Sequence, residues 1–379
     1  MNSRIFLSLP HLGGGEMKWI EEAFKDSWVV PLGPNVNEFE RLLGVYLGNP
    51  NIVALSAGTA ALHLGLVALG IEAGDEVICQ SFTFAASANP ILYQGAKPVF
   101  VDSEKDTWNM CPTALEEAII ERKGITGMYP RAIIPVHLYG MPAKMDKITE
   151  IANKYAIPIL EDAAEALGST YQGKQCGTFG QYGALSFNGN KIITTSGGGA
   201  LICPDAEADK RIKFLATQAR ENKPYYYHNV IGYNYRLSNI SAGIGCGQMQ
   251  VLDSHVARRR TIHEIYSNRL KDLEGVHVMQ NPSDEYDSNF WLTTITFDEQ
   301  WDITPEDIRL ALEAENIETR WLWRPMHMQP LFADAPYYGG NCAQNLYEHG
   351  LCLPSGSSLT DEEIHRVADA LISFFNDKK

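Results

Sequence analysis

The chain has 379 residues, of which 45% are apolar and 20% are charged, and its formal net charge at pH 7 is −15. This composition is typical of a globular protein and argues against a disordered chain, a collagen-like repeat or a small disulfide-stabilised scaffold. The negative charge argues against non-specific binding to nucleic acid or to an anionic membrane surface.

Up to about residue 250, short apolar runs typical of β-strands alternate with segments of helical periodicity. A run over 51–55 precedes a helical segment over 58–70, in which Leu62, Leu66 and Leu69 share one face. The other expected strands cover 77–81, 98–101, 132–137, 157–160 and 184–187, and two of the intervening helices cover 112–122 and 144–155. This alternation predicts an α/β fold with a mostly parallel sheet flanked by helices.

After about residue 252 the pattern changes to long helical segments mixed with alternating apolar runs. The helical segments cover 254–273, 305–315 and 361–375, and an alternating run covers 291–297. At about 150 residues per domain, the length allows two or three domains. We therefore expect a large α/β domain over residues 1–252 and a smaller α+β domain over residues 253–379.

The chain carries no sign of a membrane or export signal. Its N-terminus lacks the apolar run of a signal peptide, and no stretch approaches the ~18 apolar residues of a membrane span. The seven cysteines are scattered without a Cys-x-x-Cys pair, which argues against a disulfide framework and a structural metal site. We expect a cytoplasmic protein without a nucleic-acid or membrane partner.

Chemically active residue types follow two of the expected strands, at the sheet edge where α/β proteins bind ligands. One apolar run ends in Glu161 and Asp162, and another is followed by Ser186 and Lys191. A lysine that is held near a carboxylate and shielded from water can lose its proton and attack a carbonyl carbon. Taken alone, however, Lys191 is better explained as an exposed loop lysine.

The segment Ser56-Ala57-Gly58-Thr59 follows the first expected strand and runs into the first expected helix. Free N–H groups at the helix start and the hydroxyls of Ser56 and Thr59 would together bind a phosphate. A simple N-cap by one of these hydroxyls explains the segment equally well. The chain has neither a GxxxxGK[ST] motif nor a G-x-G-x-x-G motif after a strand, which argues against nucleotide hydrolysis and dinucleotide binding.

Together, a phosphate-binding turn, an aldehyde-capturing lysine and a carboxylate for a pyridine nitrogen match the needs of pyridoxal 5′-phosphate (PLP). Here the chain resembles the DegT/DnrJ/EryC1/StrS sugar aminotransferases over nearly its whole length. The resemblance is carried by WVVPLGP (28–34), SAGTAALH (56–63), SFTF (81–84), EDAA (161–164), SFNGNK (186–191), GYNYR (232–236) and PMH (325–327). It implies the fold of type I PLP-dependent transferases.

The resemblance implies catalytic roles for two residues. Lys191 would join the cofactor aldehyde covalently and later carry the transferred proton, and Asp162 would hold the pyridine N–H. Arginine could not replace Lys191, because a guanidinium does not lose its proton. Relatives that dehydrate sugars have His at this position, so the lysine favours transamination. At Glu165 many relatives have Gln or His near the phenolic oxygen of the ring, and a carboxylate there requires that one of the two groups be protonated.

The resemblance also implies how the rest of the cofactor is held. Phe84 would stack on the ring, and Gly58, Thr59 and Ser186 would bind the phosphate. Asn234 would reach the same phosphate from the neighbouring subunit. The expected protein is therefore a homodimer with shared active sites.

Four residues are expected at the substrate: Pro31, Arg236, Arg320 and His327. The cationic side chains of Arg320 and His327 suit a diphosphate or the carboxylates of an amino donor. The neighbouring Trp321 and Trp323 would stack on a base or simply pack in the core. The tyrosines at 225–227 would line the partner's pocket or form part of a dimer interface.

Further segments resemble one subgroup, the C4 aminotransferases of the bacillosamine pathway, which also have Glu at position 165. These segments are LSLPHLGG (7–14), EDAAEALGS (161–169), NGNKIITTSGGG (188–199), TQAREN (217–222) and GYNYRLSN (232–239). The subgroup uses L-glutamate to convert a UDP-linked 4-keto-6-deoxy-N-acetylhexosamine into UDP-4-amino-4,6-dideoxy-N-acetylglucosamine.

Two alternatives remain open. The chain would be an aminotransferase for another nucleotide-linked keto sugar, such as a GDP-linked 4-keto-6-deoxy-mannose, with the same Lys191 chemistry. Or it would be a non-catalytic PLP-binding regulator, which the absence of an added DNA-binding domain and the negative charge disfavour.

Overall fold

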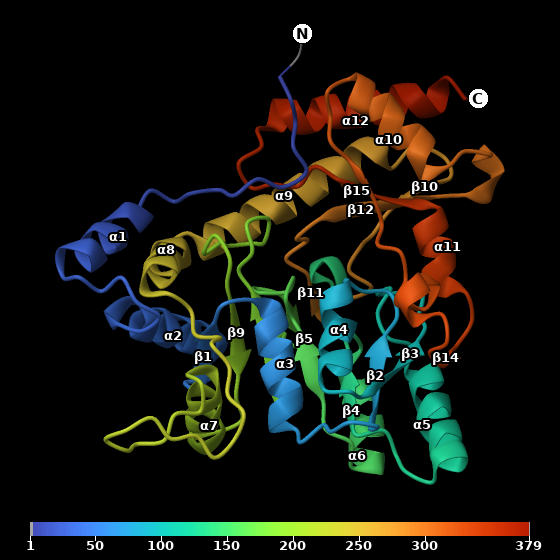
Figure 1. Ribbon diagram of the computed structural model, residues 1–379. Helices are drawn as coiled ribbons and strands as arrows, with labels where there is room; N and C mark the ends of the chain where they lie inside the picture. Colours follow the sequence, from blue (N-terminus) through green and yellow to red (C-terminus); the bar gives the residue numbers. More distant parts are fainter. Residues whose placement is uncertain (1–2, 379) are drawn as a thin grey trace.

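The computed structural model describes residues 3–378, and a twisted β-sheet lies at its centre (Figure 1). Two four-stranded ladders are joined by bridges between Ile133 and Ile159 and between Val136 and Asp162. In spatial order the strands are β1 (Ile52–Leu55), β9 (Gly199–Ile202), β8 (Tyr182–Ser186), β5 (Leu160–Asp162), β4 (Ala132–Ile134), β2 (Glu76–Gln80), β3 (Lys97–Val101) and β14 (Tyr337–Tyr338). Within this sheet only β9 runs antiparallel to its neighbours, which confirms the expected mostly parallel sheet.

Helices cover both faces of this sheet, because alternate strand residues point to opposite faces. One face packs against α3 (Gly58–Ala68), α4 (Ala85–Tyr93) and α7 (Ala206–Ala216). The other packs against α2 (Pro34–Leu47), α5 (Pro112–Thr126), α6 (Met145–Tyr155) and α8 (Asn239–Met249), and α1 (Glu16–Lys25) lies outside α8. A fully buried sheet of this kind needs the near-continuous apolar strands that the sequence shows.

The C-terminal part forms a second core of its own. Its antiparallel sheet contains, in order, β10 (Val276–Val278), β12 (Thr293–Phe297), β15 (Gly350–Leu353) and β13 (Arg320–Trp321). Its helices are α9 (Leu252–Leu270), α10 (Pro305–Ala314), α11 (Cys342–Glu348) and α12 (Asp361–Asn376). A third, small sheet contains β11 (Tyr286–Asp287), β6 (Thr170–Tyr171) and β7 (Lys174–Gln175).

Each core includes a short segment from the other part of the chain. Ile5 pairs with Ile317 and is buried in the C-terminal core, whereas β14 leaves that part of the chain to pair with β3. The expected boundary at residue 252 falls at the first residue of α9, and the division into two domains stays a prediction. Residues 1–2 and 379 of the expected domains lie outside the described residues.

Two local differences from the expected elements change the site. The strand expected over 157–160 is observed as Leu160–Asp162, so that Glu161 and Asp162 lie inside it and point to opposite faces. Strand β9 was not expected, because its start lies in a run of glycines that the sequence pattern assigns to a loop.

The structure also bears on membrane spans and on the state of the cysteines. Among residues 3–378, no helix is both long and apolar enough to span a membrane. All seven cysteines are free thiols.

Gly199 sets how closely β9 approaches the first turn of α3. A Cβ atom at this position would lie 2.4 Å from the Gly58 nitrogen and 2.5 Å from the carbonyl carbon of Ala57. These are backbone atoms and cannot rotate away. We therefore expect Gly199→Ala to lower the free energy of unfolding by about 1–3 kcal/mol, measured by urea denaturation.

Gly197→Ala is the matched control, because an added Cβ there meets no atom within 4 Å. It should change the free energy of unfolding by less than about 0.5 kcal/mol. Equal stability of the two variants would contradict the packing described for β9 and α3.

Candidate active site

A cavity of about 810 Å³ lies at the carboxyl ends of β1, β5 and β8. Segments far apart in the sequence form its walls, because parallel strands bring their carboxyl ends to one edge of the sheet. The structure brings together eight of the expected site residues in this cavity: Gly58, Thr59, Phe84, Asp162, Glu165, Ser186, Lys191 and Arg320.

Asp162 ends β5 with its side chain toward the cavity and is 5% exposed. Its Oδ2 accepts a hydrogen bond of 2.6 Å from the Ser87 hydroxyl, which lies 2.6 Å from the hydroxyl of Thr83. Its Oδ1 accepts the N–H of Ala164 at 3.1 Å. Each carboxylate oxygen has two lone pairs, so capacity remains on the cavity side for one more donor.

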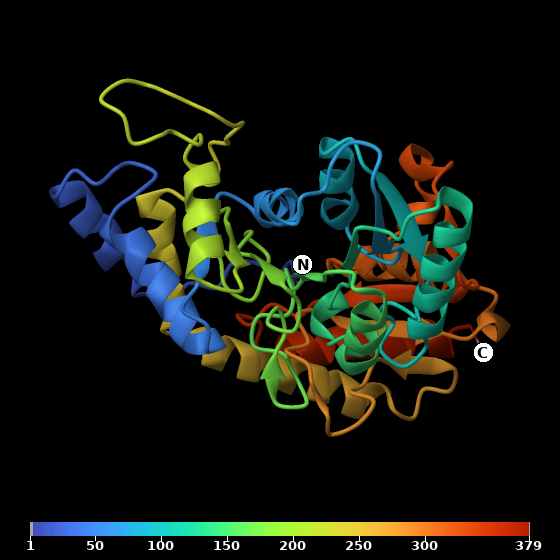
Figure 2. The same ribbon diagram turned by 90° about the horizontal axis from the view of Figure 1, so that it is seen from below.

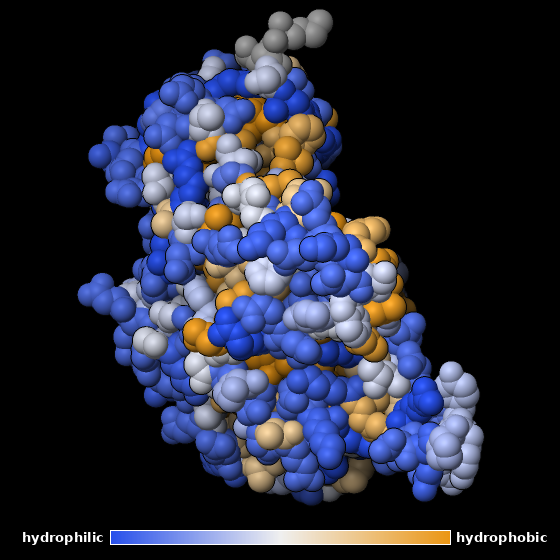
Figure 3. Space-filling model, turned by 90° about the vertical axis from the view of Figure 1, so that its left-hand side faces the viewer, coloured by the Kyte–Doolittle hydropathy of each residue, from blue (hydrophilic) through white to orange (hydrophobic). Residues whose placement is uncertain are grey.

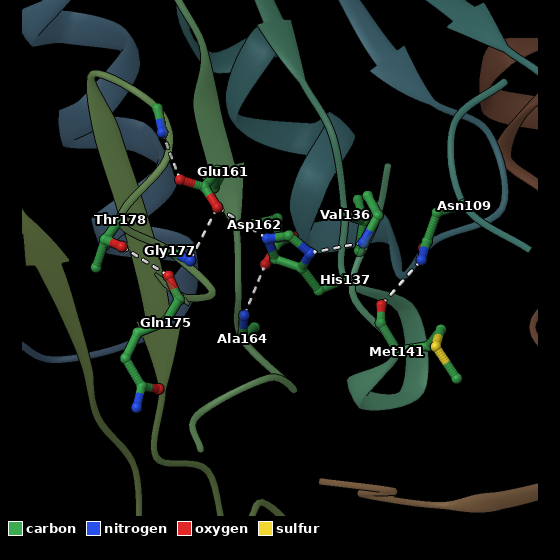
Figure 4. Close-up of polar contacts among 12 residues, drawn as sticks. Asn109, Val136, His137, Met141, Glu161, Asp162, Ala164, Gln175, Gly177 and Thr178 are labelled. Carbon is green, nitrogen blue, oxygen red and sulfur yellow. Dashed lines mark hydrogen bonds and ion pairs between the residues drawn. The ribbon is translucent and has the colours of Figure 1, made fainter. Parts of the chain in front are cut away.

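Glu161 was expected at the same rim, and this expectation is wrong because strand residues alternate in direction. Figure 4 shows its carboxylate beside Gly177 and the imidazole of His137. The Ala143 N–H donates to Nδ1 of His137, so Nε2 carries the proton that His137 donates to Glu161 at 2.9 Å. The pair is fully buried and holds β5 against its neighbours, away from the cavity.

Lys191 lies in a turn after β8 that its own N–H closes by donating to Asn188. Its Nζ lies 3.1 Å from Oε1 of Glu165 and 4.1 Å from the ring centre of Trp291. The two charged side chains are only 12% and 4% exposed. The expected contact between lysine and a shielded carboxylate is therefore present, and the partner is Glu165.

The surroundings of Glu165 favour its neutral form more than water does. Burial raises the pKa of Glu165 from its ordinary value, and the Lys191 ammonium opposes this shift. The second oxygen of Glu165 accepts the N–H of Tyr139 at 2.8 Å. Tyr139 has a φ of 54°, a left-handed conformation that costs free energy for a bulky residue and turns this N–H toward Glu165.

The start of α3 provides an anion site at the other end of the cavity. Its N-cap is Ala57, so no side chain caps the helix, and the alternative of a Ser56 or Thr59 cap is not observed. Among the described residues, the hydroxyls of Ser56, Thr59 and Ser186 have no hydrogen-bond partner. An added Cβ at Gly58 would lie 3.0 Å from the Ser186 Cβ, so glycine allows this close approach.

These observations fit PLP. The uncapped helix start and three free hydroxyls offer donors for a phosphate. Phe84, which is 58% exposed and lines the cavity, offers an aromatic face. Asp162 has an acceptor for a ring N–H, and Lys191 offers an amine for the aldehyde.

Four expected residues do not line the cavity of this chain. Arg236 is bound by Glu40 at 2.5 Å, and His327 pairs with the Ser81 hydroxyl at 2.7 Å. Burial lowers the pKa of His327, which disfavours the cationic form expected for this side chain. Pro31 and Asn234 lie outside the cavity, and the roles of all four residues at the substrate and cofactor stay predictions.

The mouth of the cavity combines charge and aromatic surface. The guanidinium of Arg320 is held by Glu318 through bonds of 3.1 and 2.8 Å, and its side chain is 70% exposed. Trp321 and Trp323 both line the cavity, and the Trp321 indole N–H donates to Glu306. The two tryptophans therefore combine packing with a place at the site.

Several cavity residues were not identified from the sequence. Trp291 lines the cavity and contacts Lys191, and Tyr139 and Ser87 lie behind the cavity wall, where they donate hydrogen bonds to Glu165 and Asp162. The N-terminal residues 6–9 also line the cavity. The resemblance of 7–14 to the bacillosamine subgroup was the one signal that pointed to this segment.

Comparison with known proteins identifies the chain. Residues 10–372 match the model of the DegT/DnrJ/EryC1/StrS aminotransferase family. The chain is 51% identical over 380 residues to EpsN of Bacillus subtilis (strain 168), which is named as a candidate pyridoxal phosphate-dependent aminotransferase. The aligned region covers 99% of this chain and 97% of EpsN. It is 37% identical over 368 residues to GDP-perosamine synthase of Caulobacter vibrioides, with 97% of each chain covered.

Among solved structures, the PLP form of Spr1654 from Streptococcus pneumoniae, a candidate sugar aminotransferase, gives a TM-score of 0.91 at 25% identity over 100% of both chains. The fold, the cavity and these similarities agree. The chain therefore belongs to the DegT/DnrJ/EryC1/StrS aminotransferase family and is a PLP-dependent sugar aminotransferase of fold type I.

Proposed function

We propose that the chain moves an amino group from L-glutamate to the C4 keto group of a UDP-linked 4-keto-6-deoxy-N-acetylhexosamine. The product is UDP-4-amino-4,6-dideoxy-N-acetylglucosamine. The observation that carries the amino transfer is the contact of Lys191 with Glu165 in the cavity. The resemblance of five segments to the bacillosamine-pathway C4 aminotransferases supports this sugar.

When bound, PLP supplies an aldehyde that takes up the amino group and a ring that withdraws electrons from the reacting carbon. The chain supplies the proton transfers. Lys191 is the one amine among the residues that line the cavity, so its Nζ takes the proton from the donor carbon and returns it to the acceptor. Asp162 holds a positive ring nitrogen by an ionic hydrogen bond.

The same residues keep water from the reacting atoms. Trp291 is 2% exposed and lies against the Lys191 amine, and Glu165 and Tyr139 close the space behind it. Protein groups rather than water surround the amine in this setting. Because less water screens it, its electrostatic interactions with charged groups are stronger.

A second sugar has its own support. The similarity to GDP-perosamine synthases extends over nearly the whole of both chains, so a GDP-linked 4-keto-6-deoxy sugar is the second candidate acceptor. The Lys191 chemistry is common to both candidates. The non-catalytic alternative is supported by one relative, a pleiotropic regulatory protein of Geobacillus stearothermophilus that is 32% identical over 364 residues. The family to which the chain belongs is one of aminotransferases, which favours the catalytic function.

The proposed enzyme works as a homodimer. Figure 3 shows apolar side chains exposed on the side of the molecule that carries α1 and α2. The exposed apolar residues of this region include Met17, Phe24, Trp28, Val29, Val30 and Leu32.

The segment between α7 and α8 extends away from the rest of the chain and contains the exposed Tyr225, Tyr226 and Tyr227 (Figure 2). Asn234 lies near the base of this segment, where it pairs with Thr217. This projecting segment and the exposed apolar side support a partner contact through which Asn234 reaches the partner's site. The cytoplasmic location of the enzyme stays a prediction.

We expect Lys191→Arg and Lys191→Ala to lose amino transfer by about a thousandfold or more, because neither side chain can supply a neutral amine. The measurement is the change of the PLP absorption band on addition of L-glutamate. Lys210→Ala, an exposed lysine on α7, should respond like the parent protein. Conversion of the band in Lys191→Arg would contradict the role of Lys191.

Shared sites predict complementation between two inactive variants. Mixing refolded Lys191→Ala and Asn234→Ala subunits should restore up to about a quarter of the parent activity, because each hybrid dimer contains one intact site. The measurement is transaminase activity after mixing, with each variant alone as the control. Activity no greater than the sum of the separate variants would show that Asn234 does not act across the dimer.

A competition assay separates the two sugars. With L-glutamate in excess and equal amounts of the UDP-linked and GDP-linked 4-keto-6-deoxy sugars, we expect kcat/KM to favour the UDP-linked sugar by about tenfold or more. A preference for the GDP-linked sugar would replace the first candidate by the second. Amination of neither sugar would reject both.

A further inference from the structure

The carbonyl oxygen of Asn190, the residue before Lys191, accepts two hydrogen bonds from distant parts of the chain. The Ser8 hydroxyl donates to it at 3.0 Å, and the indole N–H of Trp291 donates at 2.7 Å. Asn190 and Lys191 share a rigid peptide plane, so these two bonds fix the orientation of the plane to which the Cα of Lys191 is attached.

Trp291 also contacts the other end of the same lysine. Its ring centre lies 4.1 Å from the Lys191 Nζ, and its side chain is buried. A cation or amine over an indole face is held by the ring quadrupole. Trp291 therefore contacts both the peptide before Lys191 and the reacting nitrogen, and it limits the movement of the side chain between them.

Both donors to Asn190 are held by one buried side chain, Arg259 of α9. The guanidinium is 1% exposed. It donates to the carbonyl of Trp291, to the carbonyl of Ser355 at 3.0 Å and to the Ser8 hydroxyl at 3.0 Å. A guanidinium presents its donors in a rigid plane, so it fixes three segments relative to one another.

Arg259 is costly to bury. Within residues 3–378 no carboxylate lies within ion-pair distance of it, and its Nε has no hydrogen-bond partner. Burial lowers the pKa of Arg259 to about 9, and the side chain still carries its charge at neutral pH. Burial of a cation without an anionic partner is costly, and the three hydrogen bonds that Arg259 donates offset part of this cost.

We propose that Arg259, Ser8 and Trp291 form a positioning relay that holds the Lys191 amine at the reacting atoms. Arg259 fixes Ser8 and Trp291, and these two fix the peptide that precedes Lys191. The relay links the N-terminal segment, α9 and the segment just before β12 to the loop after β8. The inference rests on the aminotransferase activity of the chain and is independent of which sugar is the acceptor.

The experiment removes each hydrogen bond to Asn190 separately and together. The variants are Ser8→Ala, Trp291→Phe and the double variant, all prepared with PLP. Ser357→Ala is the matched control, because the Ser357 hydroxyl pairs with His11 of the same N-terminal segment and makes no contact with Asn190. The readouts are the dissociation constant of PLP, kcat and KM for L-glutamate, and the thermal unfolding midpoint.

We expect each single variant to lower kcat and to weaken PLP binding by about three- to tenfold, the effect of one hydrogen bond, with KM for L-glutamate unchanged. The double variant should lose more than the product of the two single effects, because each donor partly compensates for the other. Ser357→Ala should match the parent protein in kcat and in PLP binding.

Two results would overturn the proposal. One is kcat and PLP affinity in Ser8→Ala and Trp291→Phe that match Ser357→Ala. The other is a loss that follows the unfolding midpoint, with KM rising as kcat falls, which is the result of general loosening. Because PLP binding is measured without any sugar, failure of the relay is distinguishable from failure of the proposed sugar substrate.

A substitution of Arg259 tests whether its planar hydrogen-bond donors position Ser8 and Trp291. Arg259→Lys keeps a positive charge but lacks the planar donors, so it should reproduce the kcat and PLP-binding losses of the double variant. Parent-like values in a folded Arg259→Lys protein would show that Arg259 acts only as a charge and would remove it from the relay.

Discussion

The contact between the Lys191 amine and the Glu165 carboxylate, shielded from solvent, is the interaction on which the site depends. An exposed lysine remains charged and solvated and cannot serve as a nucleophile. A lysine buried without a partner would destabilise the fold. Glu165 is the partner of the buried lysine, and burial raises the pKa of this carboxyl while the Lys191 ammonium opposes the shift. The strained Tyr139 backbone and the Trp291 ring then keep the pair in place.

The parallel sheet explains why residues so far apart in sequence meet at this pair. Strands β1, β5 and β8 end at one edge, and each delivers a different chemical group there: a helix start, a carboxylate and the lysine loop. The antiparallel β9 lies between β1 and β8 and brings glycine backbone against the start of α3. The sheet therefore sets the positions of the strand ends from which the anion site and the lysine loop begin.

Much of this site was predictable from the sequence, because strand ends and glycine-rich turns have local signatures. The strand at Ile52–Leu55, the helix from Gly58 and the roles suggested for Asp162 and Lys191 all depend on residues close together in the chain. The direction of Glu161 was not predictable, because the expected strand ended at residue 160, whereas the observed strand continues to Asp162 and its alternation turns Glu161 to the opposite face. Trp291 and Arg259 escaped notice for a different reason: their partners are more than thirty residues away, and an apolar run or a helical arginine gives no sign of them.

The short strand β14 has a mechanical consequence for how substrates enter. It pairs the C-terminal part with the edge strand β3 of the main sheet, and Ile5 of the N-terminal segment pairs with Ile317 of the C-terminal part. These two backbone pairings oppose the hinged domain opening by which many two-domain enzymes admit ligands. The structure therefore favours entry and exit of ligands by movement of the side chains at the rim of the cavity, such as the exposed Arg320.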